Sequence, residues 1–297
     1  MLRDLPRPVG LVLAGGGVYG AAHVGAGHAL EQRGFVPQLV VGTSVGALNG
    51  AMAAAHPGAA AESLDHLWMS VRRGQVFPFT GPRSAGGICT DRGLRRIIAK
   101  AGLPSRIEQL AVPFTAVAVD LYTGAPAALD RGDLESALLA SAAIPGIFPP
   151  VSREGRLLID GGPLAYVPVR AAQQAGAASL VVVTAGPESW PLRPTVPPRR
   201  PRAIAARAGL LALHHQIEHD LQEVAEDIPT VVLPTGIEVW PAPWDLRHSR
   251  RLMRTAAATS AQFLDSVVVR GPGLYRFAAP EPVETAGRMS SSIARSR

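Results

Sequence analysis

A serine between two glycines is the feature of this chain that points most directly to chemistry. The segment 42–46 reads Gly-Thr-Ser-Val-Gly and follows the short apolar run 39–41. In hydrolases the G-x-S-x-G pattern forms a sharp turn between a strand and a helix, and the turn leaves no room for side chains two residues either side of the serine. The helix expected over 47–55 would direct its N-terminal amides at an anion forming there. Ser44 is therefore the candidate nucleophile.

A second glycine cluster, Gly15 to Gly17, follows the strand expected over 9–14. With Gly20 it formally matches the G-x-G-x-x-G fingerprint of dinucleotide-binding folds. That fingerprint also requires an acidic residue at the end of the second strand to bind the ribose, and none is present there. The alternative is a nest of backbone amides beside Ser44 that serves as an oxyanion hole. A tight turn without a chemical role is the third interpretation, but three consecutive glycines exceed what one turn needs.

The candidate nucleophile also needs a base. In Ser-His-Asp hydrolases with this turn the histidine follows a late strand, whereas the eight histidines here all fall in or beside expected helices. Asp160 does follow a strand, expected over 157–159, and the two glycines after it would let the carboxylate approach Ser44. A partly desolvated carboxylate can accept the serine proton directly, because burial raises its pKa towards the working pH. The structural alternative for Asp160 is a turn-forming Asp before Gly.

The rest of the chain alternates between strand and helix patterns. Further strands are expected over 114–120, 180–184 and 230–233. Further helices are expected up to residue 33 and over 60–72, 91–101, 133–141, 169–175, 204–226 and 245–265. This alternation predicts an α/β fold with three layers, in which helices cover both faces of a mainly parallel sheet. Ligands of such folds bind at the carboxyl ends of the strands, and the glycine run, the serine and the aspartate each follow a strand.

Together these elements resemble the patatin-like phospholipase (lipid acyl hydrolase) family. The family pattern is a glycine-rich oxyanion loop, then G-x-S-x-G, then D-G-[GA], and all three occur here in that order between about residues 9 and 184. The segment 141–150, Ser-Ala-Ala-Ile-Pro-Gly-Ile-Phe-Pro-Pro, is also similar to the family's S-A-[SA]-x-P-x-x-F-P-P stretch, which neither a turn nor a core requires. The compact length resembles stand-alone bacterial relatives of the neuropathy-target-esterase branch. Tyr19 departs from the pattern, because the family usually has Arg or Lys there.

The resemblance implies a patatin-like fold and a Ser44–Asp160 dyad that transfers an acyl group from a lipid or other acyl ester, without metal or cofactor. Asp160 would accept the serine proton during attack and then activate the water that releases the fatty acid. The oxyanion would be held by the backbone amides of Gly15, Gly16, Gly17 and Val45. One rival is a non-catalytic lipid-binding or regulatory protein of the same fold, against which the intact dyad argues. The other is an acyltransferase, which Thr43 before the serine and the aspartate partner disfavour.

Two histidines and the single cysteine each allow a functional and a structural interpretation. His215 and His219 share a helical face, which suits either a metal pair or, as we expect, a solvated surface. Cys89 is either reactive or, as we expect, a small buried residue near a helix start. An acyl channel is expected to include Ile88, Leu94 and Phe148.

A membrane-facing surface is another expectation that stays open. Two indoles, Trp240 and Trp244, precede a helix rich in arginine, and a proline-rich loop over 187–202 carries Arg199, Arg200 and Arg202. Such a pairing suits a membrane interface, but a loop packed on the domain and a solvated helix explain it more simply. The formal charge of +6 alone does not indicate nucleic-acid binding, because no aromatic-basic motif accompanies it.

The chain is expected to form one catalytic domain over 1–269, with the exposed loop at 187–202, and a flexible tail over 270–297. A single cysteine excludes an internal disulfide and suits a reducing compartment. Neither a signal peptide nor a run of 18 apolar residues is apparent. The expectation is a cytoplasmic protein, with peripheral membrane contact left open.

Overall fold

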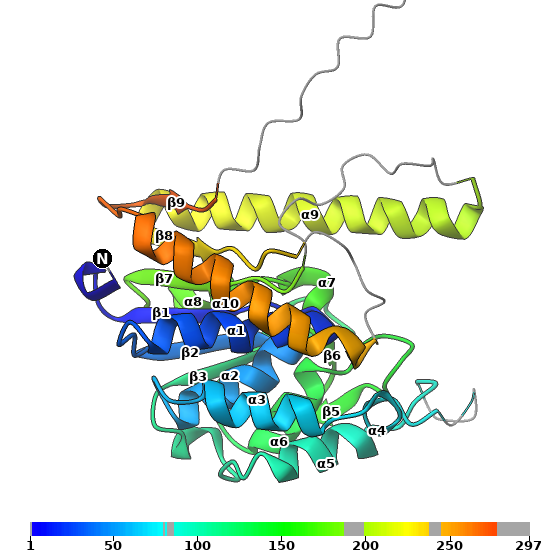
Figure 1. Ribbon diagram of the computed structural model, residues 1–297. Coiled ribbons are helices and arrows are strands. Elements are labelled where there is room, and N and C mark those ends of the chain that lie inside the picture. The colour runs from blue at the N-terminus through cyan, green and yellow to red at the C-terminus, as the bar shows by residue number, and fades with distance from the viewer. Residues whose placement is uncertain (1, 80, 82–85, 187–198, 238–244, 278–297) are drawn as a thin grey trace, which may run out of the picture.

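A nine-stranded sheet forms the middle layer of the computed structural model, which describes residues 2–79, 81, 86–186, 199–237 and 245–277 (Figure 1). The strands are β1 (Val9–Leu13), β2 (Leu39–Thr43), β3 (Phe114–Asp120), β4 (Pro126–Leu129), β5 (Val151–Arg153), β6 (Arg156–Asp160), β7 (Ser179–Val183), β8 (Pro229–Leu233) and β9 (Gly273–Tyr275). Six of them run parallel, in the order β3-β2-β1-β7-β8-β9. Every residue of β1, β2, β3, β7 and β8 is buried, as expected for parallel strands covered on both faces.

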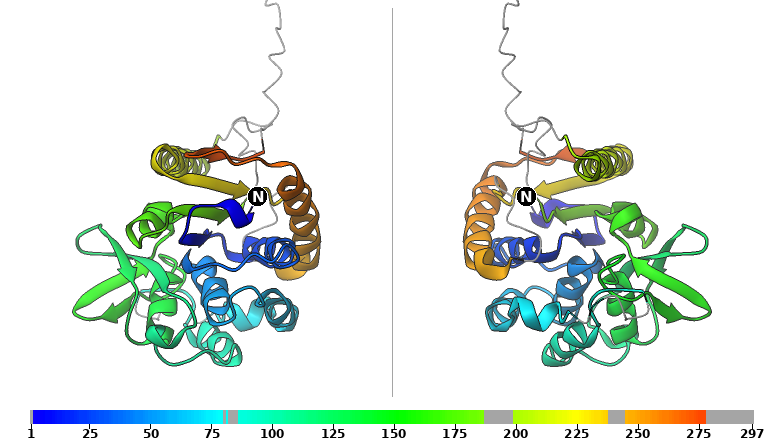
Figure 2. Two further views of the ribbon diagram at one scale, coloured as in Figure 1. Left: turned by 90° about the vertical axis from the view of Figure 1, so that its left-hand side faces the viewer. Right: turned by 90° about the vertical axis from the view of Figure 1, so that its right-hand side faces the viewer.

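Helices cover both faces of this sheet, so the three-layer α/β prediction is confirmed (Figure 2). One face carries α1 (Ala21–Glu31), α2 (Val45–Ala55), α3 (Ala61–Ser70), α6 (Leu134–Ser141) and α10 (Ser249–Ser266). The other face carries α8 (Val169–Gln174) and α9 (Pro201–Asp227). The short helices α4 (Arg73–Val76) and α7 (Gly162–Ala165) flank the carboxyl edge, and α5 (Arg92–Lys100) packs on α4 and α6. Four 3-10 turns lie at Leu2–Asp4, Gly17–Gly20, Ile107–Gln109 and Leu246–His248.

The abundance of Gly and Ala in this chain has a packing consequence between α1 and α10. A Cβ atom on Gly25 of α1 would lie 2.0 Å from the carbonyl oxygen of Met253 on α10. The two helices therefore pack backbone against backbone, and any side chain at that position would force them apart.

The sheet and the long helix both extend beyond their predicted limits. Helix α9 begins at Pro201 rather than 204, because a proline suits the first turn of a helix, where its missing N–H costs nothing. Strand β9 pairs with β8 inside the range expected as a tail. It was missed because three residues are too few to show a strand pattern. The prediction of a flexible loop and tail otherwise falls on 187–198 and 278–297, which lie outside the described residues.

None of the described helices is both long enough and apolar enough to cross a bilayer.

Candidate active site

The candidate nucleophile and base come together because two strands meet end to end along β3. Strand β2 pairs in parallel with the first part of β3, up to Thr43 opposite Val117. Strand β6 pairs antiparallel with the last part, where Asp160 is opposite Ala118. Strand β4 pairs with residues of β3 that both others use, so it must occupy the opposite edge, and β2 and β6 share one edge. Their carboxyl ends therefore face each other, which brings Ser44 next to Asp160.

The turn at Ser44 has the strained geometry that its sequence predicts. The serine has φ 56° and ψ −124°, a conformation that is costly for a residue with a side chain. A Cβ atom on Gly42 would lie 2.2 Å from the Gly46 carbonyl oxygen, and one on Gly46 would lie 2.1 Å from that of Leu13. Both glycines of the motif are thus required by sterics, as predicted.

Hydrogen bonds from neighbouring elements hold this turn in place. The Ser44 amide donates to Ser141 Oγ at 2.9 Å, and the Ser141 hydroxyl donates to the Val117 carbonyl at 2.6 Å. The Thr43 hydroxyl donates to the Ala165 carbonyl at 2.7 Å. Ser141 thus links α6, β3 and the turn. Sequence reasoning gave it no role, although it begins the 141–150 segment that carried the family resemblance.

Asp160 is a buried carboxylate with one free acceptor site. Only 4% of the residue is exposed, and its Oδ1 accepts a hydrogen bond from the Gly162 amide at 2.7 Å. Its Oδ2 is also buried and has no hydrogen bond of ordinary geometry from any described residue. Burial raises the pKa of Asp160 to about 6, while favourable interactions with the Ser44 hydroxyl and the Gly162 amide limit the rise. A Cβ atom on Gly161 would lie 2.4 Å from the Val117 carbonyl oxygen, so this glycine lets the aspartate's turn lie close to β3.

The glycine-rich loop passes beside the serine, but one of its expected donors is already occupied. A Cβ atom on Gly15 would lie 3.7 Å from the Ser44 Cβ. The Gly15 amide donates to the Tyr166 carbonyl at 2.8 Å, so it is not available to an oxyanion. The amides of Gly16 and Gly17 donate to no described acceptor, and Val45 begins helix α2, whose first amides lack intrahelical acceptors. Gly16 has φ 150°, a conformation open to glycine.

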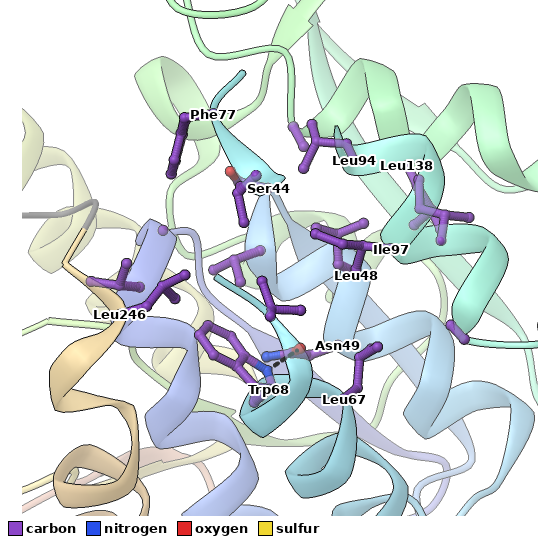
Figure 3. Close-up of a pocket in the computed structure, with 18 of the residues that line it drawn as sticks. Ser44, Leu48, Asn49, Leu67, Trp68, Phe77, Leu94, Ile97, Leu138 and Leu246 are labelled. Atoms are coloured by element: carbon purple, nitrogen blue, oxygen red, sulfur yellow. Dashed lines mark hydrogen bonds between the residues drawn. The ribbon is translucent and has the colours of Figure 1, made fainter. Parts of the chain in front are cut away.

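A small cavity of about 110 Å³ extends from Ser44 among the side chains drawn in Figure 3. Its lining is almost wholly apolar, with Ser44 at one end and Leu67 and Trp68 at the other. The polar groups of Trp68 and Asn49 are hydrogen-bonded: the indole N–H donates to the Asn49 side-chain oxygen at 3.1 Å, and the Asn49 side-chain nitrogen donates to the Gly20 carbonyl at 2.9 Å. Leu94 and Phe148 belong to this lining, as expected for an acyl channel.

A wider cleft of about 1100 Å³ opens on the other side of the serine. Its lining includes Ser44, Asp160 and the glycine-rich loop, and Asp160 is the one acidic residue among the described residues that line it. Arg73 contributes a positive charge. Ile88, expected in the acyl channel, lines this cleft instead. Ser44 thus lies where a small apolar cavity meets a wider cleft.

The other residues singled out in the sequence differ in burial and in the groups around them. Tyr19 is 1% exposed, and burial raises its pKa to about 12, so a neutral hydroxyl stands where the family usually has a cation. Cys89 is buried and burial raises the pKa of its thiol, which disfavours the reactive thiolate. His219 lies 3.6 Å from Glu223, and the described part of the chain holds no group of three His, Cys, Asp or Glu suited to a metal. Trp240 and Trp244 lie outside the described residues.

The fold and the site define a three-layer α/β protein with a serine elbow facing a buried aspartate. The model of the patatin-like phospholipase family matches residues 11–172, and the chain belongs to that family. An uncharacterized NTE family protein of Mycobacterium bovis is 35% identical over 194 residues, which are 65% of this chain and 53% of that protein. Human patatin-like phospholipase domain-containing protein 6 is 30% identical over 184 residues, 60% of this chain and 13% of that protein. The predicted relationship to the neuropathy-target-esterase branch is confirmed.

The solved structure of VipD from Legionella pneumophila has the same fold, with a TM-score of 0.54 and 14% identity, covering 88% of this chain and 67% of that one. The chain spans about half the length of its mycobacterial relatives.

Proposed function

We propose that this protein is a serine-dependent lipid acyl hydrolase of the phospholipase A, lysophospholipase or esterase type. The observation that carries the proposal is the position of Ser44, beside a buried carboxylate and between a small apolar cavity and a wider cleft. An ester with an apolar acyl chain fits this division. The cavity takes the part of the chain nearest the carbonyl, and the wider cleft, whose lining is also largely apolar, takes the rest of the molecule.

In the proposed mechanism Asp160 accepts the Ser44 proton while the serine oxygen attacks the ester carbonyl. The oxyanion is stabilised by the amides of Gly16, Gly17 and Val45, so the glycine-rich loop and helix α2 act together. Collapse of this intermediate expels the alcohol, which takes the proton from Asp160, and leaves the acyl chain on the serine. Water then gives a proton to Asp160 as it attacks the acyl-enzyme. The bond to Ser44 breaks, the serine oxygen takes that proton from Asp160, and the fatty acid is released.

A phosphate-bearing substrate is supported by the charge of the cleft. Arg73 lines it and forms no ion pair with a described residue, and of the described residues in the lining only Asp160 is acidic. One of the curated relatives, 29% identical over 180 residues that are 60% of this chain and 10% of that protein, is the lysophospholipase NTE1 of Mycosarcoma maydis. Lysophospholipids are therefore our first choice among substrates.

Fluorophosphonate labelling together with an ester panel tests the proposal. Wild type should label and should hydrolyse p-nitrophenyl esters and lysophospholipids, whereas Ser44→Ala should do neither. Asp160→Asn should lose on the order of a thousandfold in kcat/KM, with circular dichroism confirming that both variants are folded. An unlabelled wild type would favour the non-catalytic lipid-binding alternative. Transfer of the acyl group to added lysolipid or glycerol, in place of release as fatty acid, would favour an acyltransferase.

A further inference from the structure

The N-terminal half of helix α9 projects from the body of the protein beside the mouth of the cleft. In Figure 1 this yellow-green end of α9 extends past the rest of the described residues, on the side of the sheet's carboxyl edge. Between 201 and 213 no residue is buried, and Ile204, Leu210 and Leu211 are 50%, 40% and 44% exposed. Exposing several large aliphatic side chains to water on one helix is unfavourable, and such groups of side chains often mark interaction sites.

The C-terminal half of the same helix is anchored to the domain. Arg170 of α8 forms ion pairs with Asp220 and Glu223, and the Gln216 side chain donates to the Leu164 carbonyl of α7. Five residues of this half are buried. The contacts of the C-terminal half therefore fix the position of the projecting half relative to the cleft.

Charge is distributed unevenly along the helix. All its acidic residues lie at 218 or beyond, while Arg199, Arg200 and Arg202 cluster at its start, and its first turn holds no acidic residue. Positive charge at a helix N-terminus opposes the helix dipole. Helix stability therefore does not account for these arginines, which leave positive charge at the helix start available to an external anion.

The projecting half of α9 is continuous with the candidate active site. Leu210 and Leu213 line the cleft that contains Ser44 and Asp160. On the rest of its lining Phe79 and Ile88 are 73% and 40% exposed, and Arg73 is also exposed. Ile204 and Leu211 are seven residues apart and so share the opposite side of the helix, away from the cleft.

We propose that residues 199–213, together with Phe79 and Ile88, dock the mouth of the cleft on an anionic lipid bilayer. Exposed aliphatic and aromatic side chains enter the interface while the arginines contact lipid phosphates, as in interfacial helices. The inference rests on the proposed function and deepens it, because an ester substrate would then pass from the membrane into the cleft without crossing water.

Vesicle co-sedimentation of the full chain carrying Ser44→Ala measures docking without lipid hydrolysis. This protein should bind vesicles of equal parts phosphatidylcholine and phosphatidylglycerol, bind vesicles of phosphatidylcholine alone much less, and lose binding as salt is added. Replacing Arg199, Arg200 and Arg202 by Gln should weaken binding roughly fivefold per arginine, on the order of a hundredfold in all. The double change Ile204→Ser and Leu211→Ser should weaken it on the order of tenfold or more.

Matched controls remove the same chemistry from the opposite edge of the sheet. Arg3, Arg131 and Arg270, all exposed, are replaced by Gln, which changes net charge equally. Val36 and Val268, 52% and 64% exposed, are replaced by Ser. These controls should keep vesicle binding. Equal loss in the controls and the α9 variants would overturn the proposal, and so would full binding by the α9 variants.

Further measurements distinguish membrane docking from dimerisation and from the proposed hydrolase function. A dimer in light scattering that dissociates on the Ile204→Ser and Leu211→Ser change would assign this face to a second copy of the chain and overturn membrane docking. With the serine restored, the α9 variants should hydrolyse a soluble short-chain p-nitrophenyl ester like wild type, and lose activity on vesicles alone. Vesicle binding by a wild type that hydrolyses no ester would sustain docking while removing the proposed hydrolase function.

Discussion

At the scale of single residues, the proposed chemistry depends on the burial of Asp160. A carboxyl group exposed to water has a pKa near 4 and is a poor match for a base at neutral pH. Burial raises the pKa of Asp160 to about 6, which makes the carboxylate more basic while leaving it charged at neutral pH. In the proposed mechanism, burial thus gives Asp160 the basicity that a histidine has in the more familiar triads.

The first prediction is a pH dependence of the hydrolysis rate. Since the base must be unprotonated, kcat/KM should rise with pH through an apparent pKa of about 6 and then level off. Initial rates with a soluble ester between about pH 5 and about pH 8 measure it. The residual activity of Asp160→Asn should lack this transition. If the transition survives in that variant, another group, such as a histidine, is the base.

The second prediction concerns stability. A carboxyl whose pKa is higher in the folded state binds protons more tightly there, so its protonation stabilises the fold at low pH, and this contribution is lost as pH rises from about 4 to about 6. Asparagine carries no charge at any pH. Asp160→Asn should therefore be more stable than wild type at pH 8, by on the order of 3 kcal/mol at most, and the difference should vanish near about pH 3.

Urea unfolding at the two pH values measures this difference. Asp130→Asn is the matched control, because the Asp130 side chain is 53% exposed and should respond little. A less stable Asp160→Asn at pH 8 would mean that the charged form is stabilised by interactions stronger than its burial cost. If Asp160→Asn is more stable than wild type but inactive, the wild-type aspartate lowers the stability of the fold and is required for activity.

At the scale of elements, the site depends on strands and helices held in contact at the serine turn. Ser141 at the end of α6 accepts from the Ser44 amide and donates to the Val117 carbonyl of β3. Through these two bonds the helix fixes a turn whose backbone is strained. We regard Ser141 as a positioning residue, since it acts through the backbone of the nucleophile.

The third prediction is that Ser141→Ala lowers kcat about tenfold or more with little change in KM, because the turn loses the two bonds that fix it, each worth about 1 kcal/mol. Steady-state kinetics with a short-chain ester measure the effect. Ser260→Ala is the control, since this buried serine also donates one hydrogen bond, to Pro234, but lies in α10 away from the site. Both changes should lower Tm. An equal loss of kcat in both would assign Ser141 a merely structural role.

Elements were predictable where the signal was local and were missed where it depended on distant pairing. The strand before Ser44, the glycines around it and the aspartate turn each have a local sequence pattern, so the sequence predicted them. The reason for two of the glycines is not local, because Gly46 leaves room for the Leu13 carbonyl and Gly161 for that of Val117. The antiparallel direction of β6 follows from its pairing with β3, which no local pattern encodes. For the same reason the bond from the Gly15 amide to Tyr166 was not foreseen, and Gly15 was wrongly expected to be a free oxyanion donor. The short strands β4 and β5 were missed as well.

At the scale of the whole molecule, the two spaces that meet at Ser44 would divide a substrate of the proposed hydrolase into two parts. The small apolar cavity lies among α2, α3, α5 and α6, while the wider cleft lies between α4, α7 and α9. This arrangement predicts that acyl-chain preference and the response to the alcohol portion can be changed separately. Of the cavity-lining residues in Figure 3, Leu67 is among the farthest from the serine.

The last prediction uses this position to test where the acyl chain binds. Leu67→Trp fills the far end of the cavity, so a long chain loses the burial of a few methylene groups, at about 0.8 kcal/mol each. Hydrolysis of p-nitrophenyl palmitate should fall on the order of tenfold in kcat/KM, while that of the acetate ester, which has a single carbon beyond the carbonyl, should be unchanged. Leu67→Met conserves volume and should leave both rates as they are. Equal loss with both esters would show that the substitution disturbs the fold, and unchanged palmitate hydrolysis in a folded variant would place the acyl chain in the wider cleft instead.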